Sequence, residues 1–346
     1  MSATMGKVHR AVMSRIAEPV RAVFLDTPAG FQLNADEISA KAVEYFKQRF
    51  NIDLTVASFK AAAATPAEID DALHKLQVAN YIFAGPGSPT YAIRNWQGTP
   101  ILEAMAQRLA SGVHLIFASA AAITMGRYAL PVYEIYKVGE EPHWVDGLDL
   151  LGPYGVELAI VPHWNNAEGG THDTRYCFMG GPRFKRLEES LPDSTVILGI
   201  DEYTACIVDL SSDECRVMGI GQVTIRYRGR EIHHPAPAAF KLDQLRRARL
   251  ASEQGYPLQT SPLAQTMTEV EEALHKLPAD GSDQPDTESG DMASVVPLIE
   301  LIVQVRTQLR AARQWALADE IRGRLSELGI ILEDGPEETT WRKGGL

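Results

Sequence analysis

The sequence has few cysteines, no long apolar run and no excess of positive charge. Only three of its 346 residues are cysteine, and Cys177, Cys206 and Cys215 lack the spacing of a zinc site. Their small, odd number also excludes a disulfide framework, so we expect reduced thiols. No apolar run approaches the roughly 18 residues that span a bilayer, and the first ten residues lack the apolar core of a signal peptide. We therefore expect a cytoplasmic protein with no membrane contact.

The charge balance of the chain limits the kinds of partner that it can bind. The formal net charge is −12, with 33 Lys and Arg against 45 Asp and Glu, which disfavours broad binding to nucleic acid or to anionic membranes. The net charge does not exclude a local basic patch. The pair His233–His234 has no carboxylate cluster nearby, so we expect no metal, and nothing in the sequence calls for a cofactor.

From about residue 19 to 230, strand-like apolar runs alternate with segments of helical period, which is typical of an α/β fold. We predict a mostly parallel sheet flanked by helices on both faces. The predicted strands are 21–25, 53–59, 80–84, 113–117, 156–161, 195–200, 205–209 and 221–227, with the last two as an antiparallel extension. The predicted helices are 36–50, 66–78 with Thr65 as N-cap, 100–111 and a basic one over 240–255.

The C-terminal third changes in composition. Residues 277–291 are acidic and rich in Pro, Gly and Ser, which is typical of a disordered linker. After it, apolar residues at helical spacing predict a helical hairpin that ends near Gly329, followed by the strand-like residues 330–333. We therefore expect an α/β domain over 1–256, a linker over 257–294 and a small helical module over 295–346.

Ser119 is the first candidate for chemistry. It follows the apolar run 113–117 and has alanines on both sides, in Phe117-Ala-Ser-Ala-Ala-Ala122. A nucleophile elbow needs small neighbours, because the strand turns sharply into a helix and leaves the hydroxyl exposed beside a free backbone N–H. The alternative is that Ser119 is only the N-cap of a well-packed helix.

Complementary groups end the neighbouring predicted strands, and they favour the nucleophile. His163 follows 156–161 and could act as a base, while Glu202 follows 195–200 and could orient it. The amides of Gly87, after 80–84, and of Ala120 could form an oxyanion hole. Carboxyl ends of strands meet at one edge of an α/β sheet, where ligands bind.

These motifs resemble the aspartyl dipeptidase and cyanophycinase family of serine peptidases, whose fold is similar to class I glutamine amidotransferase domains. The resemblance covers about residues 20–230. The motifs that carry it are the turn Gly85-Pro-Gly-Ser88, the elbow 117–122, the base segment Pro162-His-Trp164, the acid segment Gly199-Ile-Asp-Glu-Tyr-Thr-Ala205 and the loop 166–175. It implies Ser119 as nucleophile, His163 as general base, Glu202 as orienting acid, and Gly87 and Ala120 as the oxyanion hole.

The chain departs from the family pattern at the elbow and at the turn. Phe117 and Ala121 replace two glycines, and alanine at the second position requires a negative φ. Pro86 has no N–H, which leaves Gly87 as the donor. Three further polar residues are candidates for binding a substrate's amino group or carboxylate, with a purely structural role as the alternative for each: Glu134, His172 and Arg175.

Residues 311–342 resemble the C-terminal end of cysteinyl-tRNA synthetases, in the patterns Ala-Asp-Glu-Ile-Arg322, Leu-Gly-Ile330, Glu-Asp334 and Thr-Thr-Trp-Arg342. The catalytic motifs of those enzymes are absent, so we predict no aminoacylation. From residue 295 onward there are seven basic and eight acidic residues, which favours a docking or homodimer module over contact with RNA.

Together these observations predict a serine hydrolase that acts on a peptide or another amide through an acyl-enzyme at Ser119. The alternative is an inactive binding or scaffold protein of the same fold, with the C-terminal module recruiting tRNA or a protein partner. A glutamine amidotransferase is disfavoured, because that chemistry uses a cysteine at the elbow.

Overall fold

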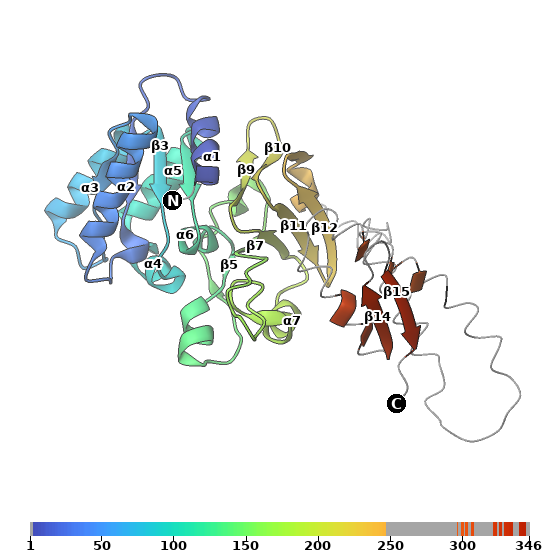
Figure 1. The fold of residues 1–346 in the computed structure, drawn as a ribbon. Helices are drawn as coiled ribbons and strands as arrows, with labels where there is room; N and C mark the ends of the chain where they lie inside the picture. The colour runs from blue at the N-terminus through green and yellow to red at the C-terminus, as the bar shows by residue number, and fades with distance from the viewer. Residues whose placement is uncertain are drawn as a thin grey trace, which may run out of the picture. The chain divides into compact units, whose positions relative to one another are not determined.

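The computed structural model describes residues 3–246 and parts of the C-terminal region, namely 296, 299–300, 302–303, 306–307, 321–323, 325–326, 329–334 and 339–343. The chain divides into two compact units, Met1–Ser261 and Pro262–Leu346, and each is described by itself (Figure 1). The expected linker 257–294 lies outside the described residues, as does the part of the expected basic helix beyond residue 246.

A parallel four-stranded sheet in the order β2-β1-β3-β4 forms one part of the first unit. Its strands are β1 (Ala22–Leu25), β2 (Thr55–Ala57), β3 (Tyr81–Ala84) and β4 (His114–Phe117). Figure 1 shows helices gathered around it; they are α1 (Ala3–Met13), α2 (Ala35–Phe50), α3 (Pro66–Val78), α4 (Pro89–Trp96) and α5 (Pro100–Ala110).

Alternation along β1 explains why helices cover both faces of this sheet. Successive side chains of a strand point to opposite faces. Val23 and Leu25 pack in a core with residues of α3, α4 and α5, whereas Ala22 and Phe24 pack in another core with residues of α1 and α2. The predicted α/β fold with helices on both faces is confirmed.

Local signals set the helix ends. Thr65 accepts a hydrogen bond from the Glu68 N–H while the Glu68 side chain bonds back to Thr65, a full capping box with Pro66 at the first position. The helix α4 was not predicted from the sequence. It begins in the same way, with Ser88 as N-cap and Pro89 after it, but its short length gives too little periodicity to detect.

A six-stranded sheet in the order β12-β11-β8-β7-β5-β6 forms the rest of the first unit, together with a three-stranded antiparallel sheet in the order β13-β10-β9. Within the six strands, β7 pairs in parallel with β8 and β5, and the other pairs are antiparallel. The six strands are β5 (Tyr128–Ala129), β6 (Val145–Asp146), β7 (Leu158–Pro162), β8 (Val196–Ile200), β11 (Gln222–Tyr227) and β12 (Arg230–Pro235). The three strands are β9 (Thr204–Asp209), β10 (Glu214–Gly219) and β13 (Ala238–Lys241).

Two sequence predictions are corrected here. The strand predicted over 205–209 does not extend the main sheet, because β9 turns back through residues 210–213 and pairs along its length with β10. Phe240 and Lys241 belong to β13 and not to a helix. Phe240 lies opposite Cys215 of β10, and both side chains pack in the same buried core.

The remaining elements of the first unit are short: the 3₁₀ turns η1 (Thr27–Ala29) and η3 (Gly152–Tyr154), the helices α6 (Ala120–Thr124) and α7 (Gly180–Glu189), and the π-helical turn η2 (Glu134–Val138). In the second unit, the described residues between 296 and 326 are helical. They share a buried core with an antiparallel hairpin of β14 (Ile330–Asp334) and β15 (Thr339–Lys343). The sequence predicted only the first strand of this hairpin. Among the described residues, no helix is long and apolar enough to cross a membrane.

Candidate active site

Ser119 lies at a strained turn between β4 and α6. Its φ of 54° and ψ of −118° lie outside the regions that a non-glycine residue normally adopts, at a cost of roughly 1–3 kcal/mol. Its hydroxyl makes no capping hydrogen bond to α6. The hydroxyl oxygen instead lies 3.0 Å from His163 Nε2. Ala121 lies inside α6, so its φ is negative, as alanine at the elbow requires.

His163 and Glu202 extend this interaction from the carboxyl ends of β7 and β8. The Nδ1 atom of His163 lies 3.0 Å from Glu202 Oε1, and both side chains are partly covered, with 32% and 25% of their surface exposed. The backbone φ of His163 is also positive, at 54°. The structure therefore brings together a hydroxyl, an imidazole and a carboxylate in the order that proton transfer from the hydroxyl needs.

Two asparagines that the sequence did not single out hold Glu202, one at its carboxylate and one at its backbone. The buried Asn166 side chain donates a hydrogen bond of 2.9 Å to Glu202 Oε1, and the Asn165 side-chain oxygen accepts one of 2.9 Å from the Glu202 N–H. They lie directly after His163 and Trp164 in the sequence, and an amide side chain at such a position can bond to a neighbouring carboxylate or N–H.

Gly87 forms the loop after β3. A Cβ at this position would lie 1.9 Å from the carbonyl oxygen of Pro28 in η1, and its φ is +155°, so a side chain is excluded. The next residue, Ser88, donates its N–H to the same carbonyl at 2.9 Å. Among the described residues, the N–H groups of Gly87 and Ala120 have no hydrogen-bond partner. Both remain available to an incoming oxygen.

One cavity contains these groups. Its volume is about 380 Å³, and Gly87, Ser119, Ala120 and His163 all line it. The rest of the lining is mostly apolar or aromatic and consists of Pro89, Ile123, Val132, Tyr133, Tyr136, Lys137, Glu168, Thr174, Cys177 and Phe178. Glu202 lies behind His163 and does not line the cavity.

A left-handed turn forms part of this lining. Tyr176, Cys177 and Phe178 have φ values of 58°, 56° and 70° in succession, which is rare for residues other than glycine. The turn is held to the base segment, because Tyr176 donates its N–H to the Trp164 carbonyl and Cys177 donates to the His163 carbonyl. Burial raises the pKa of the Cys177 thiol to about 12, so the thiol is neutral beside His163.

The three further candidates for substrate binding lie in different surroundings. Glu134 does not line the cavity, although its neighbours Tyr133 and Tyr136 do. It accepts a hydrogen bond of 2.6 Å from the Thr90 hydroxyl, which lies 3.0 Å from Ser88 Oγ, and its second oxygen is buried without a partner among the described residues. Glu134 is thereby linked to the loop that carries Gly87.

His172 and Arg175 do not contribute to the cavity lining. His172 is exposed. Arg175 donates two hydrogen bonds of 2.9 Å to Asp173 and lies over the Tyr176 ring. The guanidinium holds the pKa of the Asp173 carboxyl well below its usual value. In this structure Arg175 stabilises its own loop.

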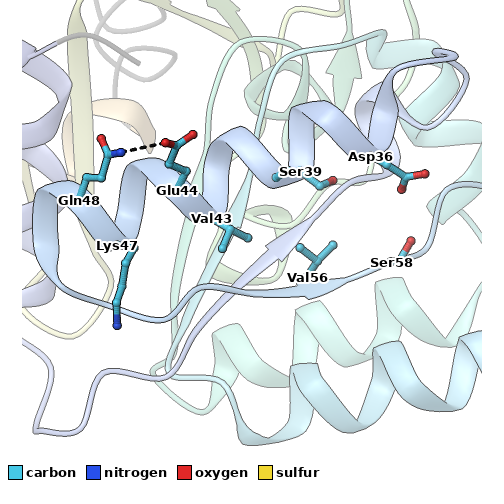
Figure 2. A pocket seen from close by; sticks show the side chains of 9 residues that line it. Asp36, Ser39, Val43, Glu44, Lys47, Gln48, Val56 and Ser58 are labelled. Carbon is cyan, nitrogen blue, oxygen red and sulfur yellow. Dashed lines mark hydrogen bonds between the residues drawn. The ribbon is translucent and has the colours of Figure 1, made fainter.

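A larger hollow of about 750 Å³ lies along α2 and β2, away from these groups (Figure 2). Val43 and Val56 face one another across it, and two of its charged residues are paired, Asp36 with Lys60 and Lys47 with Asp53. It contains no histidine or cysteine, so we assign the chemistry to the smaller cavity. The described part of the chain contains no group of three or more His, Cys, Asp or Glu residues that could hold a metal ion.

The model of peptidase family S51 matches residues 15–212, more than half of the chain. The chain belongs to peptidase family S51. The family resemblance drawn from the sequence motifs is thus confirmed, and the cavity residues Gly87, Ser119, Ala120 and His163 lie within the matched segment.

Two kinds of relative accompany this S51 match. The crystal structure of a peptidase from an acI-B1 Actinobacterium has a TM-score of 0.56 and 17% identity, and the match covers 69% of this chain and 91% of that one; it supports the fold alone. Cysteine–tRNA ligases from Tolumonas auensis and Sodalis glossinidius are 57% and 61% identical over 47 and 46 residues. One from Yersinia pestis is 34% identical over 105 residues, 30% of this chain.

These ligase matches fit the C-terminal resemblance. The chain spans about a tenth of the length of the first two ligases and 21% of the third.

Proposed function

We propose that this member of family S51 is a serine peptidase in which Ser119 is the nucleophile, His163 the general base and Glu202 the acid that orients the base. The observation that carries the proposal is the continuous pair of 3.0 Å hydrogen bonds from Ser119 Oγ to His163 and from His163 to Glu202. Serine and histidine within such reach, with the base oriented by a third group, are the requirement for an activated hydroxyl.

In the first half of the reaction, Ser119 Oγ forms a bond to the carbonyl carbon of the substrate amide, and its proton passes to His163 Nε2. The carbonyl oxygen becomes an oxyanion and accepts hydrogen bonds from the N–H groups of Gly87 and Ala120. The C–N bond then breaks as His163 returns the proton to the leaving amine. This leaves an acyl ester on Ser119 and a neutral imidazole.

Water completes the cycle. His163 takes a proton from water, whose oxygen attacks the ester carbon, and the proton then passes to Ser119 Oγ as the C–O bond breaks. Glu202 stabilises the imidazolium in both halves without taking its proton. Asn166 keeps the Glu202 carboxylate aligned with His163 Nδ1.

Covalent labelling tests the proposal. A fluorophosphonate probe should add one label to the wild-type chain, found by mass spectrometry on the peptide that contains Ser119. Ser119→Ala and His163→Ala should abolish it, and Ser111→Ala should not, because Ser111 lies at the exposed end of α5. A folded wild-type chain that resists the probe would contradict the proposal.

The similarity to cysteine–tRNA ligases supports a second proposal, which concerns the C-terminal unit: it recruits a protein partner or a tRNA. The near balance of charge from residue 295 onward favours a protein. Gel-shift titration of the full chain and of a chain ending at residue 261 with total tRNA separates the two, because only the RNA version predicts a shift that needs the C-terminal unit. A chain that binds tRNA equally well without the unit would contradict a role for it in RNA recruitment.

A further inference from the structure

One part of the cavity lining, here called the apolar wall, consists of apolar and aromatic side chains. Ile123 and Val132 are 2% and 6% exposed and line the cavity beside the rings of Tyr133, Tyr136 and Phe178. Tyr136 and Phe178 lie against each other, with ring centroids 5.1 Å apart, and the Phe178 ring lies 6.3 Å from the His163 ring. The aromatic surface therefore begins next to the base.

Backbone strain fixes the position of this surface. Phe178 is the last residue of the left-handed turn, with a φ of 70°, and donates its N–H to the Thr174 carbonyl at 2.9 Å. Tyr176, at the start of the turn, is stacked on Phe184 with centroids 4.3 Å apart and meets Trp164 edge-on. Anchoring of Tyr176 in this aromatic cluster offsets the strain and leaves Phe178 facing the cavity.

Charge is confined to the rim of the lining. Lys137 and Glu168 are both exposed, and the Lys137 ammonium lies 4.7 Å from the centroid of the Tyr136 ring, on which it rests as a cation on an aromatic face. Within the lining, Ile123, Val132 and Phe178 are apolar, and the two charged side chains, Lys137 and Glu168, are exposed to solvent. Burying a substrate carboxylate or ammonium against the three apolar side chains without a partner would be costly.

The wall also lies close to the proposed oxyanion hole. Ala120 and Ile123 are three residues apart on α6 and therefore share one face of it. A carbonyl oxygen bound to the Ala120 N–H places the side chain of its own residue near this face. The cavity volume of about 380 Å³ is at the small end of the roughly 300–1,000 Å³ that ligand pockets span, which suits a short peptide.

We propose that Ile123, Val132, Tyr136 and Phe178 form a subsite for a bulky apolar side chain, aromatic or branched aliphatic, on the residue whose carbonyl is attacked. The inference rests on the proposed function, since it takes Ser119 as the nucleophile. It assigns Phe178 as a specificity-determining residue.

Kinetics on matched substrates test the subsite. Aminoacyl-coumarin amides of Phe, Leu, Asp and Lys differ only in the side chain that the subsite would receive. We expect kcat/KM for Phe and Leu to exceed that for Asp and Lys by about tenfold or more, the discrimination typical of an apolar pocket. Phe178→Ala should reduce this ratio about tenfold, and Phe178→Leu should restore most of it for the Leu substrate.

The control variant is Phe31→Ala, which removes a ring that lies tilted against Tyr91 and does not line the cavity; it should leave the ratio unchanged. The rate of fluorophosphonate labelling reports whether each variant keeps a folded active site. A preference for Asp or Lys, or a Phe178→Ala variant that lowers all four substrates equally while it is still labelled, would overturn the proposal.

A binding measurement separates the subsite from the chemistry. Calorimetric titration of the Ser119→Ala chain with the dipeptides Phe-Ala and Asp-Ala needs no catalysis, and we expect Phe-Ala to bind about tenfold more tightly. Equal affinities for the two dipeptides would contradict the subsite even if Ser119 of the wild-type chain is labelled. Tighter binding of Phe-Ala together with no labelling of the wild-type chain would contradict the proposed peptidase but would still support an apolar subsite.

Discussion

Two histidines of the first unit lie in contrasting regions, one at the cavity and one on the buried side of the N-terminal helix. His163 is one-third exposed and lies between a hydroxyl and the Glu202 carboxylate. His9 of α1 is 4% exposed, and its Nδ1 lies 2.5 Å from the hydroxyl of Tyr81. The rings of Phe46 and Phe83 meet the His9 ring edge-on, each with centroids 5.4 Å apart.

The difference shows that the surroundings of a histidine, more than its hydrogen-bonded hydroxyl, decide what it can do. A carboxylate stabilises the imidazolium, so a histidine beside one can accept a proton during a reaction. Burial among aromatic rings has the opposite effect: it lowers the pKa of His9 to about 4 and raises that of Tyr81. Both groups stay neutral at physiological pH, and the pair is structural.

Removing each histidine is the strongest test of this contrast. His163→Ala should lower kcat/KM by about 10⁴- to 10⁶-fold, the range of losses on removal of a member of such a triad. His9→Gln keeps a group that can bond to Tyr81 and should leave kcat/KM within about twofold. Peptidase assays at pH 7.5 measure both, and a large activity loss in a folded His9→Gln variant would show that the N-terminal region contributes to the site.

Gly87→Ala tests the other polar component of the cavity. The new Cβ would collide with the Pro28 carbonyl, so the loop must shift and move the Gly87 N–H away from the oxyanion. We expect a loss of about 10²–10³ in kcat, as for removal of one oxyanion donor. Gly98→Ala is the control, because its φ is also positive but its Cβ would meet nothing within 4 Å; similar losses in both variants would argue against the assigned donor.

Most of the fold could be predicted because its signals are local. Thr65 with Glu68 and Pro66 marks the start of α3 without knowledge of the rest of the chain. The placement of β9 in the main sheet was wrong because strand pairing depends on residues elsewhere in the chain, here on β10, which the sequence analysis did not identify as a strand. For the same reason, the sequence predicted β14 but not its partner β15.

In the candidate site, too, some features could be predicted from local sequence and others could not. Ser119, His163 and Glu202 each follow a recognisable strand, so their common edge could be predicted from the order of elements. The turn at 176–178 could not, because its left-handed residues are Tyr, Cys and Phe, where glycine or asparagine would be the usual sign. Its conformation depends on the stack of Tyr176 on Phe184 and on hydrogen bonds to the base segment.

The acid sensitivity of the fold tests the role assigned to His9. The pKa of His9 is lower in the folded chain than the usual 6.5, so the unfolded chain binds more protons between these values and stability falls as pH drops from 6.5 towards 4. The difference corresponds to at most about 3 kcal/mol of unfolding free energy. Urea unfolding of wild type and of His9→Gln at pH 7 and pH 4.5 measures it, and identical losses in the two chains would contradict the assignment.

The smallest effect is expected from the two asparagines that bond to Glu202, and it tests what makes His163 unlike His9. Asn166→Asp replaces the N–H donor to Glu202 with a like charge beside the oxygen that bonds to His163. Loss of that hydrogen bond, at about 1–1.5 kcal/mol, should lower kcat/KM roughly tenfold. Asn165→Asp makes the same chemical change one residue away, but it keeps the oxygen that accepts from the Glu202 N–H and should cost less than about threefold. If the two variants lose activity equally, the added negative charge near the site is the cause. If only Asn166→Asp loses activity, the cause is the hydrogen bond that aligns the Glu202 carboxylate with His163, a partner that His9 lacks among the described residues.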